Sequence, residues 1–231
     1  MKQRIDNIAL IRELAASEGG VFTSALAQSF GISKHALSHA SKTGLIERIA
    51  HGAYRINSSI DDGLDPLRGF YKLTRPDEWT HERMQNFDGI AITGPTAAYI
   101  HDIGDLQPTP YAIAVPRRFN SRNSEARYTV MALQPDDVTW SHGIPITKLE
   151  KTIAILIASH EDPSLVADCF IDAVKKYGTN IFDANNLKAK IGDRSYATLF
   201  QNAADTLPEG FSIKAIDKNG HLAIMEEKAG H

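Results

Sequence analysis

The first 57 residues contain two short helical segments joined by a glycine, and this arrangement limits the possible folds more than any other feature. Apolar residues spaced three and four apart predict an amphipathic helix that begins near Ile5 and ends near Gly19. Thr23 and Ser33 stand at the N-cap positions of a second and a third helix, and Gly31 ends the second one. Two short helices around such a turn are typical of a helix-turn-helix, whose second helix enters the DNA major groove.

A predicted hairpin follows the third helix. Residues 45–49 and 53–56 have the pattern of two strands, and His51-Gly52 forms the turn between them. A hairpin directly after a helix-turn-helix makes a winged helix, and this order of elements is more specific than any single piece. The alternative is a small helical subdomain whose hairpin packs on another part of the chain.

The charge of the chain is unevenly distributed. Residues 1–57 hold seven Lys/Arg and four Asp/Glu, a net charge of +3, whereas 18 Lys/Arg stand against 24 Asp/Glu in the remainder. A basic segment on an acidic body is a hint of a nucleic-acid-binding module.

The third helix and the hairpin supply the candidate DNA contacts. Lysine and arginine neutralise phosphates, while serine and neutral histidine hydrogen-bond phosphates or base edges. The candidates are Lys34, His35, Ser38, His39, Lys42, Arg48, His51 and Arg55. For the hairpin residues, a solvated charged surface is the alternative. His35 and His39 are four apart, as in some metal sites, but no third ligand is near them in sequence, so neither a metal nor a cofactor is expected.

The rest of the chain predicts a mixed body with strands mostly first and helices later. The expected fold class is α+β, with an N-terminal winged helix-turn-helix followed by a mixed α+β body domain. The expected division is residues 1–57 for DNA binding, 58–88 for a linker and short helices, and 89–231 for the body.

One loop of the body concentrates arginine. Arg117, Arg118, Arg122 and Arg127 stand against Glu125 alone, and two aromatic residues are interleaved with them. Such a segment is a possible second basic surface that clamps nucleic-acid phosphates. A solvated loop with salt bridges to the acidic body is the alternative.

Several short segments, in order along the chain, carry the pattern of a known family. In the N-terminal part these are residues 21–33, 44–48 and 51–55. In the body they are residues 94–103, 115–118 and 143–152. Through them the chain resembles the AbiEi-type antitoxins of type IV toxin–antitoxin systems, which are linked to abortive phage infection in bacteria. It departs from the family at Asp102, where glycine is expected, and at Ile155, where many relatives carry an aspartate.

The resemblance implies a function for each part of the chain. It implies a DNA-binding antitoxin that represses its own operon, with duplex operator DNA as its partner. The single cysteine of the chain separately favours a cytoplasmic location. The toxin of such systems is nucleotidyltransferase-like, and the antitoxin opposes it without a stable complex. Residues 89–231 would then be the antitoxin domain, and no enzymatic activity is expected.

Composition and motifs leave two other functions open. A single cysteine, Cys169, excludes an intramolecular disulfide framework, and no apolar run approaches the ~20 residues that span a bilayer, so no membrane partner is expected.

One alternative function is a winged-helix regulator whose body senses a small ligand. The less favoured one is a metal-dependent nuclease built on Glu226-Glu227-Lys228, with Asp217 upstream.

Overall fold

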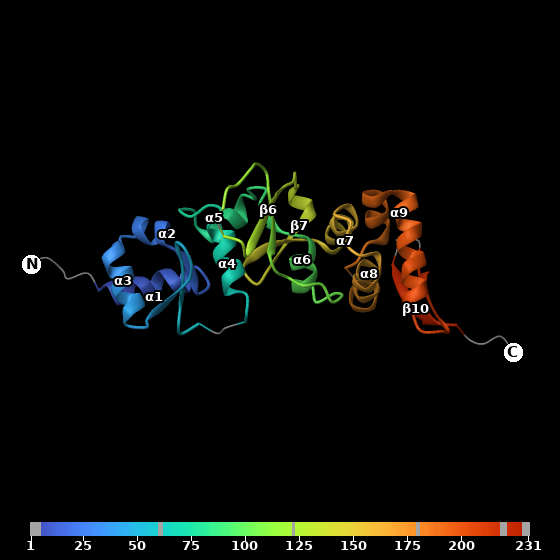
Figure 1. The fold of residues 1–231 in the computed structure, drawn as a ribbon, viewed down its shortest axis with the longest axis horizontal. Coiled ribbons are helices and arrows are strands. Elements are labelled where there is room, and N and C mark those ends of the chain that lie inside the picture. Colours follow the sequence, from blue (N-terminus) through green and yellow to red (C-terminus); the bar gives the residue numbers. More distant parts are fainter. Residues whose placement is uncertain (1–5, 60–61, 122, 179–180, 218–220, 228–231) are drawn as a thin grey trace, which may run out of the picture.

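The molecule is elongated, with three units in a row and the two termini at opposite ends (Figure 1). A computed structural model describes the chain except residues 1–5, 60–61, 122, 179–180, 218–220 and 228–231. A winged helix occupies one end, a five-stranded sheet the middle, and a helical unit with a hairpin the other end. The α+β class with an N-terminal winged helix-turn-helix, predicted from the sequence, is confirmed.

The winged helix packs three helices on a small antiparallel sheet of strand order β1-β3-β2. Its helices and strands are α1 (Asn7–Ser17), β1 (Val21–Thr23), α2 (Ser24–Ser29), α3 (Lys34–Lys42), β2 (Ile46–Ala50) and β3 (Ala53–Ile56). Leu14, Phe22 and Leu26 lie at the centre of its core. The predicted N-caps are present, since the side chain of Thr23 accepts a hydrogen bond from the Leu26 amide at 3.0 Å, and Ser33 caps α3 in the same way.

The turn between α2 and α3 depends on glycine. Gly31 has a φ of +91°, in the left-handed region that other residues rarely adopt, and Ile32 behind it is fully buried. The chain therefore reverses within a few residues and returns to the core before Ser33 begins α3.

Two helices follow the wing and connect it to the body: α4 (Asp65–Lys72) and α5 (Thr80–Gln85). Helix α4 packs on the winged-helix sheet so closely that a Cβ on Gly69 would lie 2.8 Å from Cδ1 of Ile49. Its other side buries Phe70 and Tyr71 in the core of the five-stranded sheet. The two units therefore share α4 as a common packing element.

The five-stranded sheet has the strand order β6-β5-β4-β8-β7. Strands β4 and β8 are parallel, as are β5 and β6, while β4–β5 and β7–β8 are antiparallel. The elements of this unit are β4 (Ala91–Ile92), α6 (Gly94–Ile100), β5 (Tyr111–Val115), β6 (Ala126–Val130), the 3₁₀ turn η1 (Pro135–Asp137), β7 (Val138–Ser141) and β8 (Ile144–Thr147).

The last unit surrounds a separate apolar core. It consists of α7 (Leu149–Ala158), α8 (Pro163–Tyr177), α9 (Ala184–Thr206), β9 (Phe211–Ala215) and β10 (Leu222–Glu226). Helix α9 is broken at Gly192, whose backbone is not helical. Cys169 is fully buried in this core, and burial raises the pKa of its thiol to about 12, so it is a packing residue rather than a nucleophile.

Candidate nucleic-acid interface

Helix α3 presents one apolar and one polar face. Ala36, Leu37 and Ala40 are buried against the winged-helix core. The five sequence-predicted contacts on the opposite face are all exposed: Lys34, His35, Ser38, His39 and Lys42. Within the described part of the chain, neither lysine forms an ion pair, and α3 itself carries no acidic residue. The positive charge of this face is therefore available to an external anion.

The wing places two further candidates near its turn. Arg48 on β2 and His51 in the turn are both exposed. The Arg48 guanidinium donates to Nδ1 of His51 and, at 3.3 Å, to the carbonyl of Ala50. Neither side chain contacts a carboxylate of the described residues, so the wing turn presents an unpaired cation.

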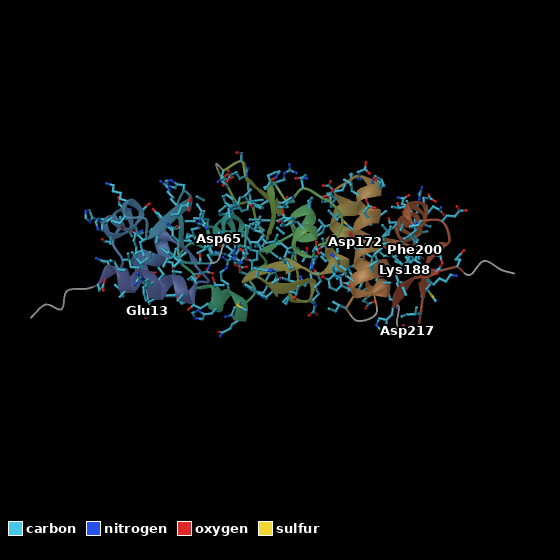
Figure 2. The ribbon with its side chains drawn as sticks, turned by 90° about the horizontal axis from the view of Figure 1, so that it is seen from below. Glu13, Asp65, Asp172, Lys188, Phe200 and Asp217 are labelled. Carbon is cyan, nitrogen blue, oxygen red and sulfur yellow. The ribbon has the colours of Figure 1, made fainter. Side chains whose placement is uncertain are left out.

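Arg55 lies in a different environment from the other seven candidates. Its Nε donates to Glu47 at 2.9 Å, and its Nη1 lies 3.6 Å from a carboxylate oxygen of Asp65. Asp65 is almost completely buried at the start of α4, at the junction of the winged helix and the body (Figure 2). The geometry of Arg55 is that of a structural contact between β3 and α4.

The structure separates the four arginines of the predicted basic loop. Arg117 and Arg118 follow β5 directly, are exposed, and form no ion pair with any described residue. Arg122 lies outside the described residues. Arg127 is on β6, next to Tyr128, which packs on Phe70 in the sheet core. Because neighbouring residues of a strand point to opposite faces, Arg127 projects from the other side of the sheet, where it borders a cavity.

The loop after β5 lies beside the wing. Ala50 and His51 of the wing and residues 119–121 and 123 of the loop line one cavity of about 520 Å³. Phe119 and Tyr128 are in aromatic contact there, with ring centroids 4.6 Å apart. The wing turn and the arginine loop are therefore adjacent parts of one surface, although about 70 residues separate them in sequence.

A buried polar network, which sequence reasoning missed, fixes the winged helix on the connecting helices. Lys72 of α4 bonds the carboxylate of Glu18 and, at 2.6 Å, the hydroxyl of Thr80; the carboxylate also accepts from the Thr80 amide at 3.1 Å. Glu18 is 4% and Lys72 is 5% exposed. Glu18 ends α1, whereas Lys72 ends α4 and Thr80 begins α5, so one carboxylate joins three helices.

The segment between α4 and α5 also contacts α2, the first helix of the helix-turn-helix. The carbonyl of Pro76 accepts from the Thr23 hydroxyl and, at 3.1 Å, from the Leu26 amide. Phe30 at the end of α2 packs edge-on against Trp79, with centroids 5.7 Å apart. No local sequence signal predicts these contacts, since the partners are about 50 residues apart.

The far end of the molecule holds the groups considered for metal or nuclease chemistry. Among the described residues, no cluster of three or more His, Cys, Asp or Glu side chains could hold a metal ion. Asp217 bonds His221 at 2.6 Å, Glu226 and Glu227 are exposed, and Lys228 lies outside the described residues.

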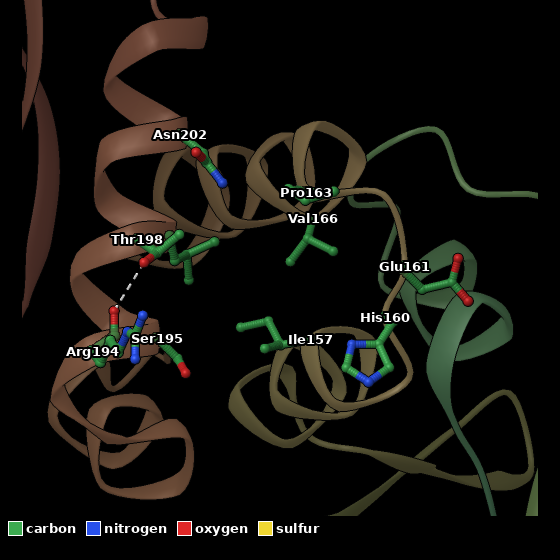
Figure 3. A pocket seen from close by; sticks show the side chains of 10 residues that line it. Ile157, His160, Glu161, Pro163, Val166, Arg194, Ser195, Thr198 and Asn202 are labelled. Carbon is green, nitrogen blue, oxygen red and sulfur yellow. Dashed lines mark hydrogen bonds between the residues drawn. The ribbon is translucent and has the colours of Figure 1, made fainter.

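A cavity of about 340 Å³ lies between α7, α8 and α9 in the same unit. Ile157 and Val166 project into it, and the hydroxyl of Thr198 donates a hydrogen bond to the Arg194 carbonyl at 3.1 Å (Figure 3). The lining combines apolar side chains with the polar side chains of His160, Glu161 and Arg194.

The three helices and the small antiparallel sheet define the N-terminal part of the chain as a winged helix with an exposed basic face on α3. Residues 9–57 match a protein family described as transcriptional regulator, AbiEi antitoxin. The winged helix of this chain is thus of the AbiEi antitoxin type, and the resemblance inferred from sequence motifs is confirmed over these residues.

Other comparisons extend the fold likeness to most of the chain. The structure is similar to the crystal structure of the Rv2827c protein from Mycobacterium tuberculosis, with a TM-score of 0.50 and 18% sequence identity. The match covers 87% of this chain and 76% of that one, and it concerns the fold alone. No curated protein matches the chain. No described helix is both long and apolar enough to cross a membrane.

Proposed function

We propose that this chain is a cytoplasmic DNA-binding antitoxin that represses its own operon and opposes a nucleotidyltransferase-like toxin without forming a stable complex with it. In this proposal residues 1–57 bind the operator, residues 58–88 attach them to the body, and residues 89–231 carry the antitoxic function. The match of residues 9–57 to a family of regulators, rather than enzymes, supports this assignment.

The observation that carries the proposal is the unpaired basic face of α3. A recognition helix must keep its cations free until phosphates replace their solvent and counterions. Lys34 and Lys42 lie near the two ends of α3, a spacing that suits contacts with the phosphates that flank a major groove. In this proposal Ser38 and His39, which lie between them on the exposed face, contact base edges.

The wing and the arginine loop extend this surface in the proposal. Arg48 and His51 lie in the wing, and the loop that carries Arg117 and Arg118 borders the same cavity as the wing turn. Each added phosphate contact increases the non-specific affinity. Arg122 belongs to this loop in sequence. Arg127 is left out of the DNA surface, because it projects from the opposite face of the sheet.

Footprinting on the DNA just upstream of the gene tests the operator function. We expect protection of one or more sites, with half-sites spaced by about one helical turn if the protein binds as a dimer. A reporter fused to the same promoter should fall when the protein is supplied. Absence of protection at micromolar protein, together with an unchanged reporter, would exclude autoregulation.

The antitoxic function needs a separate measurement. Cells that express the neighbouring toxin gene should survive when the full chain is co-expressed. A chain with the α3 lysines replaced should still rescue them if the body carries this function. Co-purification of toxin and antitoxin as a stable complex would contradict the proposed mode of action.

A further inference from the structure

A cavity of about 600 Å³ on the body has the features of a small-molecule site. It lies between the face of the sheet that carries Arg127, the start of α6 and the turn from α7 to α8. Its volume is in the range of sites that enclose small ligands. The opposite face of β5 and β6 packs on α4, so the cavity is on the side of the sheet away from the connecting helix.

The cavity wall contains a buried hydroxyl without a partner. Thr93 is 3% exposed, and its hydroxyl oxygen forms no hydrogen bond with any described residue. The neighbouring Thr96 shows the usual arrangement, because its hydroxyl donates to Pro108 at 2.6 Å and accepts from Ala112 at 2.8 Å. Buried polar groups almost always have partners, so the Thr93 hydroxyl is an exception among the buried groups beside this cavity.

Charges of opposite sign stand on different walls of the cavity. Arg127 projects from β6, and Glu161 comes from the turn between α7 and α8. No ion pair joins the two, and neither has another ion-pair partner in the part of the chain described. Figure 3 shows the Glu161 side chain turned away from Ile157 and Val166 of the smaller neighbouring cavity, which it also borders. A third charged group, Asp105, lies on the loop that follows α6.

The remaining lining is largely apolar. Its larger apolar residues are Leu106, Pro110, Met131, Ile155 and Leu165, and the polar residues Gln107, Thr109, Thr129 and Ser159 also border the cavity. A guanidinium binds a carboxylate through two parallel hydrogen bonds, and a carboxylate on another wall suits an ammonium group. A ligand that satisfies all three features carries an anionic group, a cationic group and an apolar body.

We propose that this cavity binds a free α-amino acid with an apolar side chain. The carboxylate of the amino acid contacts Arg127, its ammonium group contacts Glu161, and its side chain lies among the apolar residues. In this proposal the body domain is a sensor of a small zwitterion. This function is separate from operator binding and can be tested without DNA.

Isothermal titration of the full chain with L-leucine, L-isoleucine, L-valine, L-methionine and L-phenylalanine tests the site. We expect at least one to bind with a Kd of 1 mM or tighter. If leucine is the tightest, 4-methylpentanoate, which lacks the amine, and 3-methylbutan-1-amine, which lacks the carboxylate, should each bind at least tenfold more weakly. If the carboxylic acid binds as tightly as the amino acid, the ammonium group is not recognised. The proposal of an amino-acid site would then be wrong, and the cavity would be a simple anion site.

Variants locate the ligand. Arg127→Gln and Glu161→Gln should each raise the Kd of the tightest-binding amino acid at least tenfold. Arg117→Gln, on the loop beside the wing, should leave this Kd unchanged. Failure of all five amino acids to bind at 10 mM, or equal binding by wild type and both charge variants, contradicts the proposal.

Discussion

Helices α3 and α4 are close in sequence and both carry basic residues, but their charges are in opposite situations. Lys34 and Lys42 of α3 are exposed and unpaired within the described chain, whereas Lys72 of α4 is buried against the carboxylate of Glu18. Burial lowers the pKa of Lys72 through desolvation, and the nearby carboxylate opposes this shift. Basic composition alone does not identify a DNA contact, because the accessibility and pairing of each cation decide whether phosphate can replace its present partner.

The largest expected effect concerns the buried pair. Lys72→Met should lower the free energy of unfolding by about 3–5 kcal/mol, because it leaves the Glu18 carboxylate buried without its cation. Urea denaturation measures this loss. Lys34→Met, the matched control on α3, should change the value by less than about 0.5 kcal/mol.

A double variant sharpens this prediction. Glu18→Gln combined with Lys72→Met removes both charges and should cost less than Lys72→Met alone, since neutral groups carry a smaller desolvation penalty. Equal stability of wild type and Lys72→Met would show that the pair does not hold the winged helix on the connecting helices.

The arginine loop provides the next largest effect. Replacing Arg117, Arg118 and Arg122 by alanine should weaken operator binding roughly tenfold at moderate salt, or about 1.4 kcal/mol, since several phosphate contacts are lost. Operator affinity and rescue of toxin-expressing cells are measured separately, after the melting temperature is shown to be unchanged. Arg127→Ala is the control, because this side chain projects from the other face of the sheet.

The two assays together show which function the arginine loop has. Loss of operator affinity alone makes it a DNA clamp, and loss of rescue alone makes it an antitoxic surface. If the triple variant equals wild type in both assays, the loop is a solvated surface and the prediction is wrong.

Ser38 and His39 should affect base preference more than affinity. Ser38→Ala or His39→Ala should reduce discrimination at one operator base pair by about 1 kcal/mol, the size expected for one lost base-edge contact. Selection from a randomised operator library measures this change. An unaltered preferred sequence in both variants would place these side chains on phosphates or in solvent.

The smallest effect concerns a partly exposed pair near the start of α4. Arg68 donates to Asp62 at 2.6 Å, and this hydrogen bond lowers the pKa of Asp62 to about 2. A lowered carboxyl pKa stabilises the fold above the ordinary pKa near 4, and this contribution is lost as pH falls toward 2. Asp62→Asn should therefore cost less than about 1 kcal/mol at pH 7, and less still at pH 3. Urea unfolding at both pH values checks it, and a cost that grows toward low pH would contradict the assigned cause.

Local signals were sufficient for the winged helix. Thr23, Gly31 and Ser33 act within a few residues, so caps and a turn could be read directly from the sequence. A glycine likewise interrupts α9, where the backbone of Gly192 is not helical.

Long-range contacts could not be predicted in this way. The partners Glu18 and Lys72 are 54 residues apart, and neither carries a pattern that specifies the other. The position of Arg127 depends on strand register, because a shift of one residue moves a side chain to the other face of a sheet. The sequence therefore placed four arginines in one basic surface, whereas β6 points one of them into a separate cavity.

The salt dependence of operator binding by a Lys34→Ala, Lys42→Ala double variant tests the central claim most directly. If both lysines contact phosphates, the slope of log K against log salt should become shallower by about 2, and affinity should fall for every sequence. Lys175→Ala with Lys188→Ala removes the same charge from α8 and α9 at the far end of the molecule and should leave slope and affinity unchanged. A double variant of α3 that keeps the wild-type slope and affinity would contradict the assignment of α3 as the DNA-binding helix.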